Sequence, residues 1–443
     1  DVTLDVALYP DEPRAVTRGT YVIQNRTGKP LDEVHVRWLK PLQMTKLDVE
    51  GAKLKQEHIG QDYRIYRFDR PMAPLEVRRI TFATLREQKG FRNSDNEHRI
   101  VDNGTFLDNT EIAPMLGMSR DGLLQDRAKR RKHGLPPELR PAKLEDESAR
   151  AFSGLRRDSD WVNSDITVST TADQVAIAPG YRESDTVEGG RRTIRYRSDA
   201  PINNFFSVQS ARYEVAKDRW KNVELAVYYD PAHRYNIERM HAAMKASLDY
   251  FTAQFSPFQF RQVRILEFPD YASFAQSFAN TIPYSEGIGF VADYRDPEKI
   301  DMVTYITAHE VGHQWWGHQV ISADQQGGTF IVESLAQYSA LMVMEQMYGP
   351  EQIRKFLKYE LDRYLRSRGA EVLEELPLVR VENQPYIHYQ KGGLALYLLK
   401  DQIGADKVNE ALQGLLAEFA FKGAPYANPT DLMRRFRAVA GPE

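Results

Sequence analysis

The chain has 443 residues, of which 42% are hydrophobic and 11% aromatic, and a formal net charge of −3 at pH 7. This length exceeds one ordinary domain, so two or more hydrophobic cores are expected. The near-neutral charge argues against a nucleic-acid-binding protein. No apolar run approaches the ~18–20 residues of a membrane span, and the absence of cysteine excludes disulfides and thiolate metal ligands.

Residues 1–218 have the sequence pattern of a β-rich domain. Short runs of alternating polar and apolar residues are separated by Gly, Pro, Asn and Asp, and long helical periodicity is absent. This pattern predicts a β-sandwich or a saddle-shaped sheet. The predicted strands are 2–8, 20–24, 33–38, 63–68, 77–82, 164–168, 175–178, 193–197, 205–210 and 213–215.

Residues 125–148 interrupt this β pattern with a basic run between Arg127 and Lys132, followed by three prolines. Such a run can bind an anionic partner, but a solvated loop is the more common outcome. We therefore predict an exposed, irregular segment here.

Residues 219–443 show mixed periodicity, which indicates an α+β domain. A predicted helix at 231–255 carries an apolar stripe that includes Met240, Met244 and Leu248. Strands are expected at 223–229, 262–268 and 288–292, and further helices at 351–366, 389–402, 405–420 and 430–439.

The pattern His309-Glu310-x-x-His313 lies in a stretch with helical spacing of apolar residues. Residues four apart lie on one face of a helix, so the two imidazoles can bind one ion at ~2.0–2.1 Å, a distance that suits zinc. Glu310 lies beside that ion, where a general base for a metal-bound water belongs. Asp301 suits the helix N-terminus. The alternative is a core helix in which two histidines face each other by chance.

A catalytic zinc site needs a third protein ligand and one open position. The pattern HExxHxxGxxH fails, because residues 316 and 319 are Trp and Gln. A second helix, which Thr329 can cap and which ends at Gly349 and Pro350, supplies Glu333 on an otherwise apolar stripe. A carboxylate there needs a charged or hydrogen-bonding partner, so we predict that Glu333 is the third ligand. The alternative is a glutamate that is stabilised by the helix macrodipole.

The combination of His309, Glu310, His313 and Glu333 resembles the zinc site of the aminopeptidase N family, the gluzincin metallopeptidases. Nineteen residues separate His313 from Glu333, one more than is usual, and an insertion in the loop at 322–328 would absorb the difference. The span 309–344 resembles, more closely still, peptidase domains fused to bacterial ABC transporter permeases. The resemblance implies an all-β saddle or sandwich domain at 1–218, a thermolysin-like α+β catalytic domain at 219–443, and one Zn²⁺ per chain.

The resemblance also implies roles for residues outside the metal site. Tyr389, in a Tyr-Gln-Lys-Gly-Gly run, matches the family's Tyr-Glu-Lys-Gly element, whose phenol helps to stabilise the oxyanion; Tyr386 is a near rival. Glu286 and Gly289 match the family's Gly-Ala-Met-Glu-Asn strand, whose glutamate binds the substrate's α-amino group, and a surface strand glutamate is the alternative. Glu111 lies where the family's β-domain offers a further group to that amine.

Together these features predict a zinc metallopeptidase, and specifically an aminopeptidase that removes N-terminal residues from peptides. Glu310 would take a proton from the attacking water and pass it to the leaving amine, while zinc and Tyr389 would share the oxyanion. Two alternatives stay open. One is a non-catalytic, zinc-containing peptide-binding ectodomain of a transporter, and the other is an endopeptidase that uses the same site.

The expected partners are a peptide with a free N-terminus and the membrane transporter regions of a longer parent chain, without nucleic acid. The sequence begins directly in a strand-like run, with neither the basic nor the apolar region of a signal peptide, which suggests an excised or processed domain. The resemblance to permease-fused domains implies the extracytoplasmic, periplasmic face of a bacterial membrane, and the cytoplasm is left open.

Overall fold

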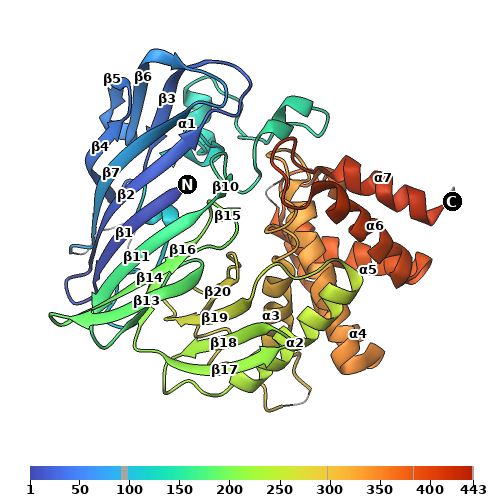
Figure 1. Ribbon diagram of the computed structural model, residues 1–443. Helices are drawn as coiled ribbons and strands as arrows, with labels where there is room; N and C mark the ends of the chain where they lie inside the picture. The colour runs from blue at the N-terminus through green and yellow to red at the C-terminus, as the bar shows by residue number, and fades with distance from the viewer. Residues whose placement is uncertain (91–97, 297, 383, 442–443) are drawn as a thin grey trace. The chain divides into compact units, whose positions relative to one another are not determined.

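The computed structural model describes residues 1–90, 98–296, 298–382 and 384–441 (Figure 1). The chain forms two compact units. The first contains Asp1–Leu123, Arg157–Glu214 and Glu267–Ala272, and the second contains Leu124–Arg156, Val215–Leu266 and Ser273–Glu443. The prediction of an all-β N-terminal part followed by an α+β part is confirmed.

The described residues of the first unit form four β-sheets. Its largest sheet has seven strands, in the order β13 (Tyr181–Glu188), β14 (Arg191–Arg197), β11 (Ser164–Thr171), β1 (Val2–Tyr9), β2 (Arg14–Gln24), β7 (Val77–Glu87) and β4 (Leu42–Val49). A four-stranded sheet contains β5 (Ala52–His58), β6 (Tyr63–Met72), β3 (Leu31–Arg37) and β9 (Met115–Leu116). Smaller sheets pair β12 (Val175–Ile177), β16 (Ser207–Ala211) and β8 (Thr105–Asp108), and β10 (Trp161–Val162) with β15 (Ile202–Asn203).

Strand β1 shows why these sequences form sheets. Its side chains alternate between buried and more exposed positions, and the buried ones are Val2, Leu4, Val6 and Leu8. It pairs in antiparallel fashion with β2 and in parallel with β11, whose residues lie 162 positions further along the chain. The alternation therefore places one apolar face in the core of the unit.

The second unit contains a four-stranded sheet and most of the helices, which Figure 1 shows from green to red. The sheet order is β17 (Glu214–Trp220), β18 (Val223–Tyr229), β19 (Gln262–Phe268) and β20 (Thr281–Ser285). Strands β18 and β19 are parallel, and α2 (Ile237–Gln254) connects them and packs on β18. The predicted apolar stripe of this helix is buried.

Helix α3 (Met302–Gly312) packs against α2 on one side and against α4 (Leu335–Ala370) on the other. Gly349, with φ of 77°, interrupts α4 just before Pro350, as the sequence predicts. The remaining helices are α5 (Gly392–Ile403), α6 (Ala405–Phe419) and α7 (Pro429–Ala440). The His309–His313 motif is thus carried on a helix that packs against two other helices.

Residues 125–148 are mostly exposed and irregular, as predicted, but the sequence prediction placed them in the first domain. They fold with the second unit and include a short helix, α1 (Arg127–Lys132). Arg130 is buried, and its guanidinium donates to two backbone carbonyls of the same segment. Arg140 makes a two-pronged ion pair with Glu382. These contacts join residues far apart in sequence, so periodicity alone does not reveal them.

Two local predictions in the second unit are wrong. Residues 288–292 form a turn, and the strand before the metal helix is β20, at Thr281–Ser285. Thr329 does not cap a helix, since its side chain makes no capping hydrogen bond and its backbone is already helical. The chain enters that helix from the tight Gly327-Gly328 turn, so the glycines rather than a polar cap determine its start.

Candidate metal centre

The N-terminus of α3 is fixed by a buried cap. The carboxylate of Asp301 accepts hydrogen bonds from the backbone N–H of Thr304 at 2.9 Å and from its hydroxyl at 2.7 Å. The Tyr348 hydroxyl donates to the same carboxylate at 2.5 Å, and Arg239 pairs with it. Because α2 and α4 supply these last two partners, the helix that carries the histidines is held at its start by both neighbours. The Asp301 cap prediction is confirmed.

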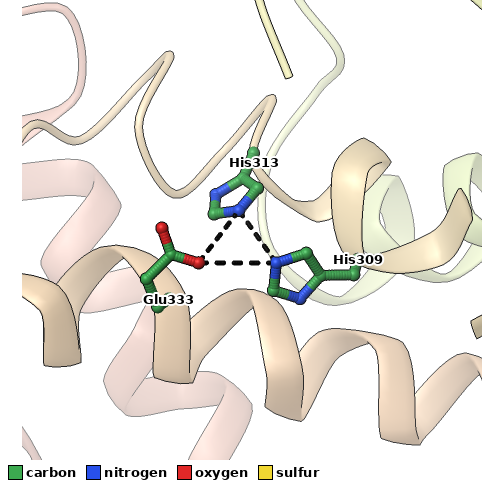
Figure 2. Close-up of side chains that lie close together, drawn as sticks. All are labelled: His309, His313 and Glu333. Carbon is green, nitrogen blue, oxygen red and sulfur yellow. Dashed lines mark hydrogen bonds and ion pairs between the residues drawn. The ribbon is translucent and has the colours of Figure 1, made fainter. Parts of the chain in front are cut away.

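The structure brings His309, His313 and Glu333 together with their ligand atoms facing one another (Figure 2). The Nε2 atoms of His309 and His313 are 3.0 Å apart. Oε2 of Glu333 lies 3.5 Å from Nε2 of His309 and 3.4 Å from Nε2 of His313. A tetrahedral zinc ion with ligands at ~2.0–2.1 Å requires ligand atoms roughly 3.3–3.4 Å apart. The three atoms therefore fit a single zinc ion.

The hydrogen bonds around these side chains also fit a cation. Nδ1 of His313 lies 2.9 Å from the carbonyl oxygen of Trp316, so it carries the proton and leaves the Nε2 lone pair for a metal. Nδ1 of His309 and Oε2 of Glu333 are buried and lack a hydrogen-bond partner within the described residues. Two nitrogen lone pairs and a carboxylate that face one another in a buried place need a positive charge between them.

The electrostatics of the free ligands agree with this assignment. Burial lowers the pKa of His313, but the facing Glu333 carboxylate outweighs burial and raises that pKa to about 9. Burial raises the pKa of Glu333, but the two imidazoles outweigh it and keep that pKa well below its usual value. The site thus favours positive charge beside an ionised carboxylate.

Glu310 lies next to the triad and is 6% exposed. Its Oε2 has no hydrogen-bond partner among the described residues, and burial raises the pKa of its carboxyl. Its backbone carbonyl accepts a hydrogen bond from Ser277 at 2.8 Å, which fixes the main chain there. The position predicted for a general base is therefore occupied by a buried carboxylate with one oxygen available.

Tyr389 is the tyrosine that lies beside the metal ligands. Its ring centroid is 5.9 Å from that of His309, and burial, followed by the charge of Glu333, raises the pKa of its phenol. The rival Tyr386 instead faces Tyr364, with ring centroids 6.0 Å apart. The geometry favours Tyr389 for the predicted role, and the phenol stays protonated near neutral pH.

Glu333 and Tyr389 both lie in π turns, η5 (Phe330–Ser334) and η7 (Ile387–Lys391). A π turn holds one more residue than an α-helical turn and occurs often at functional sites. The extra residue between His313 and Glu333 can therefore be accommodated within the helix, whereas the sequence suggested the loop at 322–328. Sequence periodicity does not reveal either π turn.

Glu286 and Gly289 lie just after β20 and not on a strand. The Glu286 carboxylate is 3.9 Å from Nδ1 of His233. Packing explains why residue 289 is glycine, since an added Cβ would lie 2.9 Å from the ring of Tyr284 and 3.2 Å from the side chain of Met240. Substrate binding by these two residues stays a prediction.

Glu111 belongs to the first unit, where its carboxylate already has strong partners. It lies 2.9 Å from Arg86 and 3.3 Å from Arg99, and it accepts a hydrogen bond from the backbone N–H of Asp108 at 3.0 Å. The last contact completes a capping box around η2 (Asn109–Glu111). These contacts give Glu111 a structural role, and its predicted role in amine binding stays a prediction.

Sequence reasoning missed Gln314 as a structural residue of the site. Its side-chain amide donates to the Ser277 hydroxyl at 2.6 Å and to the Phe278 carbonyl at 2.9 Å, and its oxygen accepts from the N–H of Asn280 at 2.9 Å. This residue ties the C-terminal end of α3 to the segment that leads into β20. A polar Gln between the predicted ligand His313 and the two tryptophans that follow is the sequence signal that could have identified it.

The second unit thus presents a two-histidine, one-carboxylate donor set on an α+β fold. Residues 235–441 match the family model described as the Peptidase family M1 domain. This match covers slightly less than half of the chain.

Curated relatives share low identity with the chain. Endoplasmic reticulum aminopeptidase 2 of Homo sapiens is 25% identical over 214 residues, which are 46% of this chain and 22% of the relative. Tricorn protease-interacting factor F2 of Thermoplasma volcanium is 22% identical over 226 residues, which are 48% of this chain and 28% of the relative. The matched part thus spans about a quarter of these relatives.

Solved structures resemble the whole chain. The M1 zinc metallopeptidase from Deinococcus radiodurans has a TM-score of 0.66 at 16% identity, and the match covers 99% of this chain and 89% of that one. A variant of an M1 zinc metallopeptidase from the same organism, bound to a Tyr-Ser-Ala substrate, has a TM-score of 0.67 at 16% identity, with 99% and 90% coverage. The likeness establishes the fold.

Proposed function

We propose that this protein is a zinc-dependent aminopeptidase. The observation that carries the proposal is the set of three ligand atoms within 3.5 Å of one another, directly beside the buried carboxylate of Glu310. Aminopeptidases among the curated relatives and a zinc metallopeptidase among the similar structures support it.

The ligand set suits the metal that this reaction needs. Zinc bound by His309, His313 and Glu333 would supply a Lewis acid that activates water and polarises the substrate carbonyl. Glu310 accepts a proton from the water while the water oxygen bonds to the carbonyl carbon of the substrate. Glu310 then delivers that proton to the nitrogen of the departing amine as the C–N bond breaks. The Tyr389 hydroxyl donates a hydrogen bond to the carbonyl oxygen as negative charge develops there.

Glu286 is the proposed anchor for the substrate's α-ammonium group. A carboxylate that pairs with an ammonium is a strong, directional contact, and it would hold the N-terminal residue in register with the scissile bond. Its position immediately after β20, in the same unit as α3, supports this assignment.

The experiment that tests the proposal compares an aminoacyl chromogenic substrate with its N-acetylated form, before and after chelation and zinc re-addition. Cleavage of the free form alone, lost on chelation, is expected. Equal cleavage of both forms would indicate an endopeptidase and remove the role of Glu286. If the zinc-loaded protein cleaves neither substrate, the result would favour the non-catalytic peptide-binding ectodomain.

We also propose that the chain is the extracytoplasmic part of a larger membrane protein that contains ABC permease segments. The resemblance of residues 309–344 to permease-fused peptidase domains supports this. None of the helices in the described residues combines the length and apolar character needed to span a bilayer. Protease added to cells with a permeabilised outer membrane is expected to digest this region of the parent protein, and full protection would contradict the proposal.

A further inference from the structure

The two π turns of the site contact each other through one buried hydrogen bond. Ser334, which follows Glu333 in η5, donates its hydroxyl proton to the backbone carbonyl of His388, which precedes Tyr389 in η7, at 2.6 Å. Ser334 has no exposed surface. The predicted metal ligand and the predicted oxyanion donor are therefore each one residue away from the same hydrogen bond.

Gly392 shows how closely the two turns approach. A Cβ on Gly392 would lie 2.1 Å from the hydroxyl oxygen of Ser334 and 2.7 Å from its Cβ. The φ of Gly392 is −61°, an ordinary helical value, so the conformation does not require glycine. Glycine has a low helix propensity. It is present at position 392 because the Ser334 side chain occupies the space that a larger side chain would need.

The other end of η7 has an anchor of its own. Lys391 pairs with Glu375, whose carboxylate also accepts from the Tyr364 hydroxyl at 2.8 Å and lies 2.5 Å from Arg368. Through Glu375, these contacts join the end of the turn to Tyr364 and Arg368 of α4. The Ser334 hydroxyl ties the backbone beside Tyr389 directly to η5, the turn that carries Glu333.

We propose that Ser334 is a positioning residue that fixes Tyr389 relative to Glu333. The inference rests on the proposed function, because Tyr389 acts on the oxyanion there. A phenol stabilises an oxyanion only from within about 2.7–3.1 Å, and misplacement by ~1 Å can cost about 100-fold in rate. A π turn is a rare, single-turn bulge in an α-helix, and the Ser334 hydroxyl gives η7 a tie from outside it.

The first test compares Ser334→Ala with Ser247→Ala. Ser247 is an equally buried serine of the same unit, and its hydroxyl donates to the Ala243 carbonyl at 2.7 Å within α2. Ser334→Ala is expected to keep one zinc per chain and nearly the same KM, and to lose about 10-fold to 100-fold in kcat. Ser247→Ala is expected to keep the wild-type kcat.

A double-variant cycle separates positioning from general stability. In a Tyr389→Phe background the phenol is already absent, so adding Ser334→Ala should lower kcat by less than about 2-fold. If the two losses instead multiply, Ser334 does not act through Tyr389 and the inference is wrong. If Ser334→Ala does not fold, Ser334→Cys replaces it, because a thiol is a weaker donor of similar size.

A readout without zinc or activity keeps this inference separate from the proposed function. In the metal-free protein, hydrogen–deuterium exchange of the amides at 387–392 is expected to be faster in Ser334→Ala than in the wild type and in Ser247→Ala. Unchanged exchange together with unchanged kcat would overturn the inference and leave the proposed function intact. If the wild-type protein cleaves no peptide, the proposed function fails, and the exchange experiment still decides whether Ser334 ties the two turns.

Discussion

Replacing Glu310 with Gln should abolish turnover while zinc stays bound. The change keeps the size of the side chain but removes its ability to accept a proton. A positioned general base contributes roughly 10²–10⁴ in rate, or about 3–5 kcal/mol of transition-state free energy. Because Glu310 is 6% exposed and one of its oxygens has no hydrogen-bond partner in the described structure, bulk water cannot easily replace it. We expect a loss near the upper end of that range.

The assay measures kcat with a free aminoacyl chromophore at saturation, alongside zinc content by elemental analysis. Glu360→Gln is the matched control, because Glu360 is a helical glutamate of similar burial, 4% exposed, whose carboxylate lies 3.7 Å from Arg363 of the same helix. We expect Glu360→Gln to retain activity within a few-fold. A Glu310→Gln variant that binds zinc and keeps a comparable kcat would refute the general-base role.

Three further predictions concern the same unit. Tyr389→Phe should lower kcat/KM by about 100-fold with zinc retained, whereas Tyr386→Phe should leave it nearly unchanged, as steady-state kinetics will show. Chelation should lower the melting temperature of the wild type, because zinc binds the folded state. Chelation should leave the melting temperature of Glu333→Gln unchanged, and equal shifts of the two proteins in thermal scans would count against Glu333 as a ligand. Burial lowers the pKa of His318 to about 4, so between pH ~6.5 and ~4 the unfolded state binds more protons than the folded state. The free energy of unfolding therefore falls by up to ~1.4 kcal/mol for each unit by which the pH drops within this range. Denaturant titrations should show a shallower fall in His318→Gln, and an unchanged slope would contradict the assignment.

The fold class and the metal triad could be predicted from the sequence because both depend on local patterns. The four-residue spacing of His309 and His313 needs only helical geometry. Glu333 stood out as a carboxylate on an apolar stripe, and the structure brings it within 3.5 Å of both histidines. Helix ends marked by Asp301 and Gly349 were predicted for the same reason.

Features that depend on contacts between distant segments could not be predicted. Residues 125–148 were assigned to the first domain because partners such as Glu382 lie more than 200 residues away. The π turns at 330–334 and 387–391 carry no sequence signal, and both depend on packing such as that of Ser334 against Gly392. Glu111 matched a functional position by resemblance, whereas Arg86 and Arg99 give it a structural role.

The most direct test of the central claim is an anomalous difference map at the zinc absorption edge from crystals of the zinc-loaded protein. We predict one strong peak at ~2.0–2.1 Å from Nε2 of His309, Nε2 of His313 and Oε2 of Glu333. A map without a peak among these atoms, or with zinc bound elsewhere in the chain, would contradict the assignment of this site as the catalytic centre.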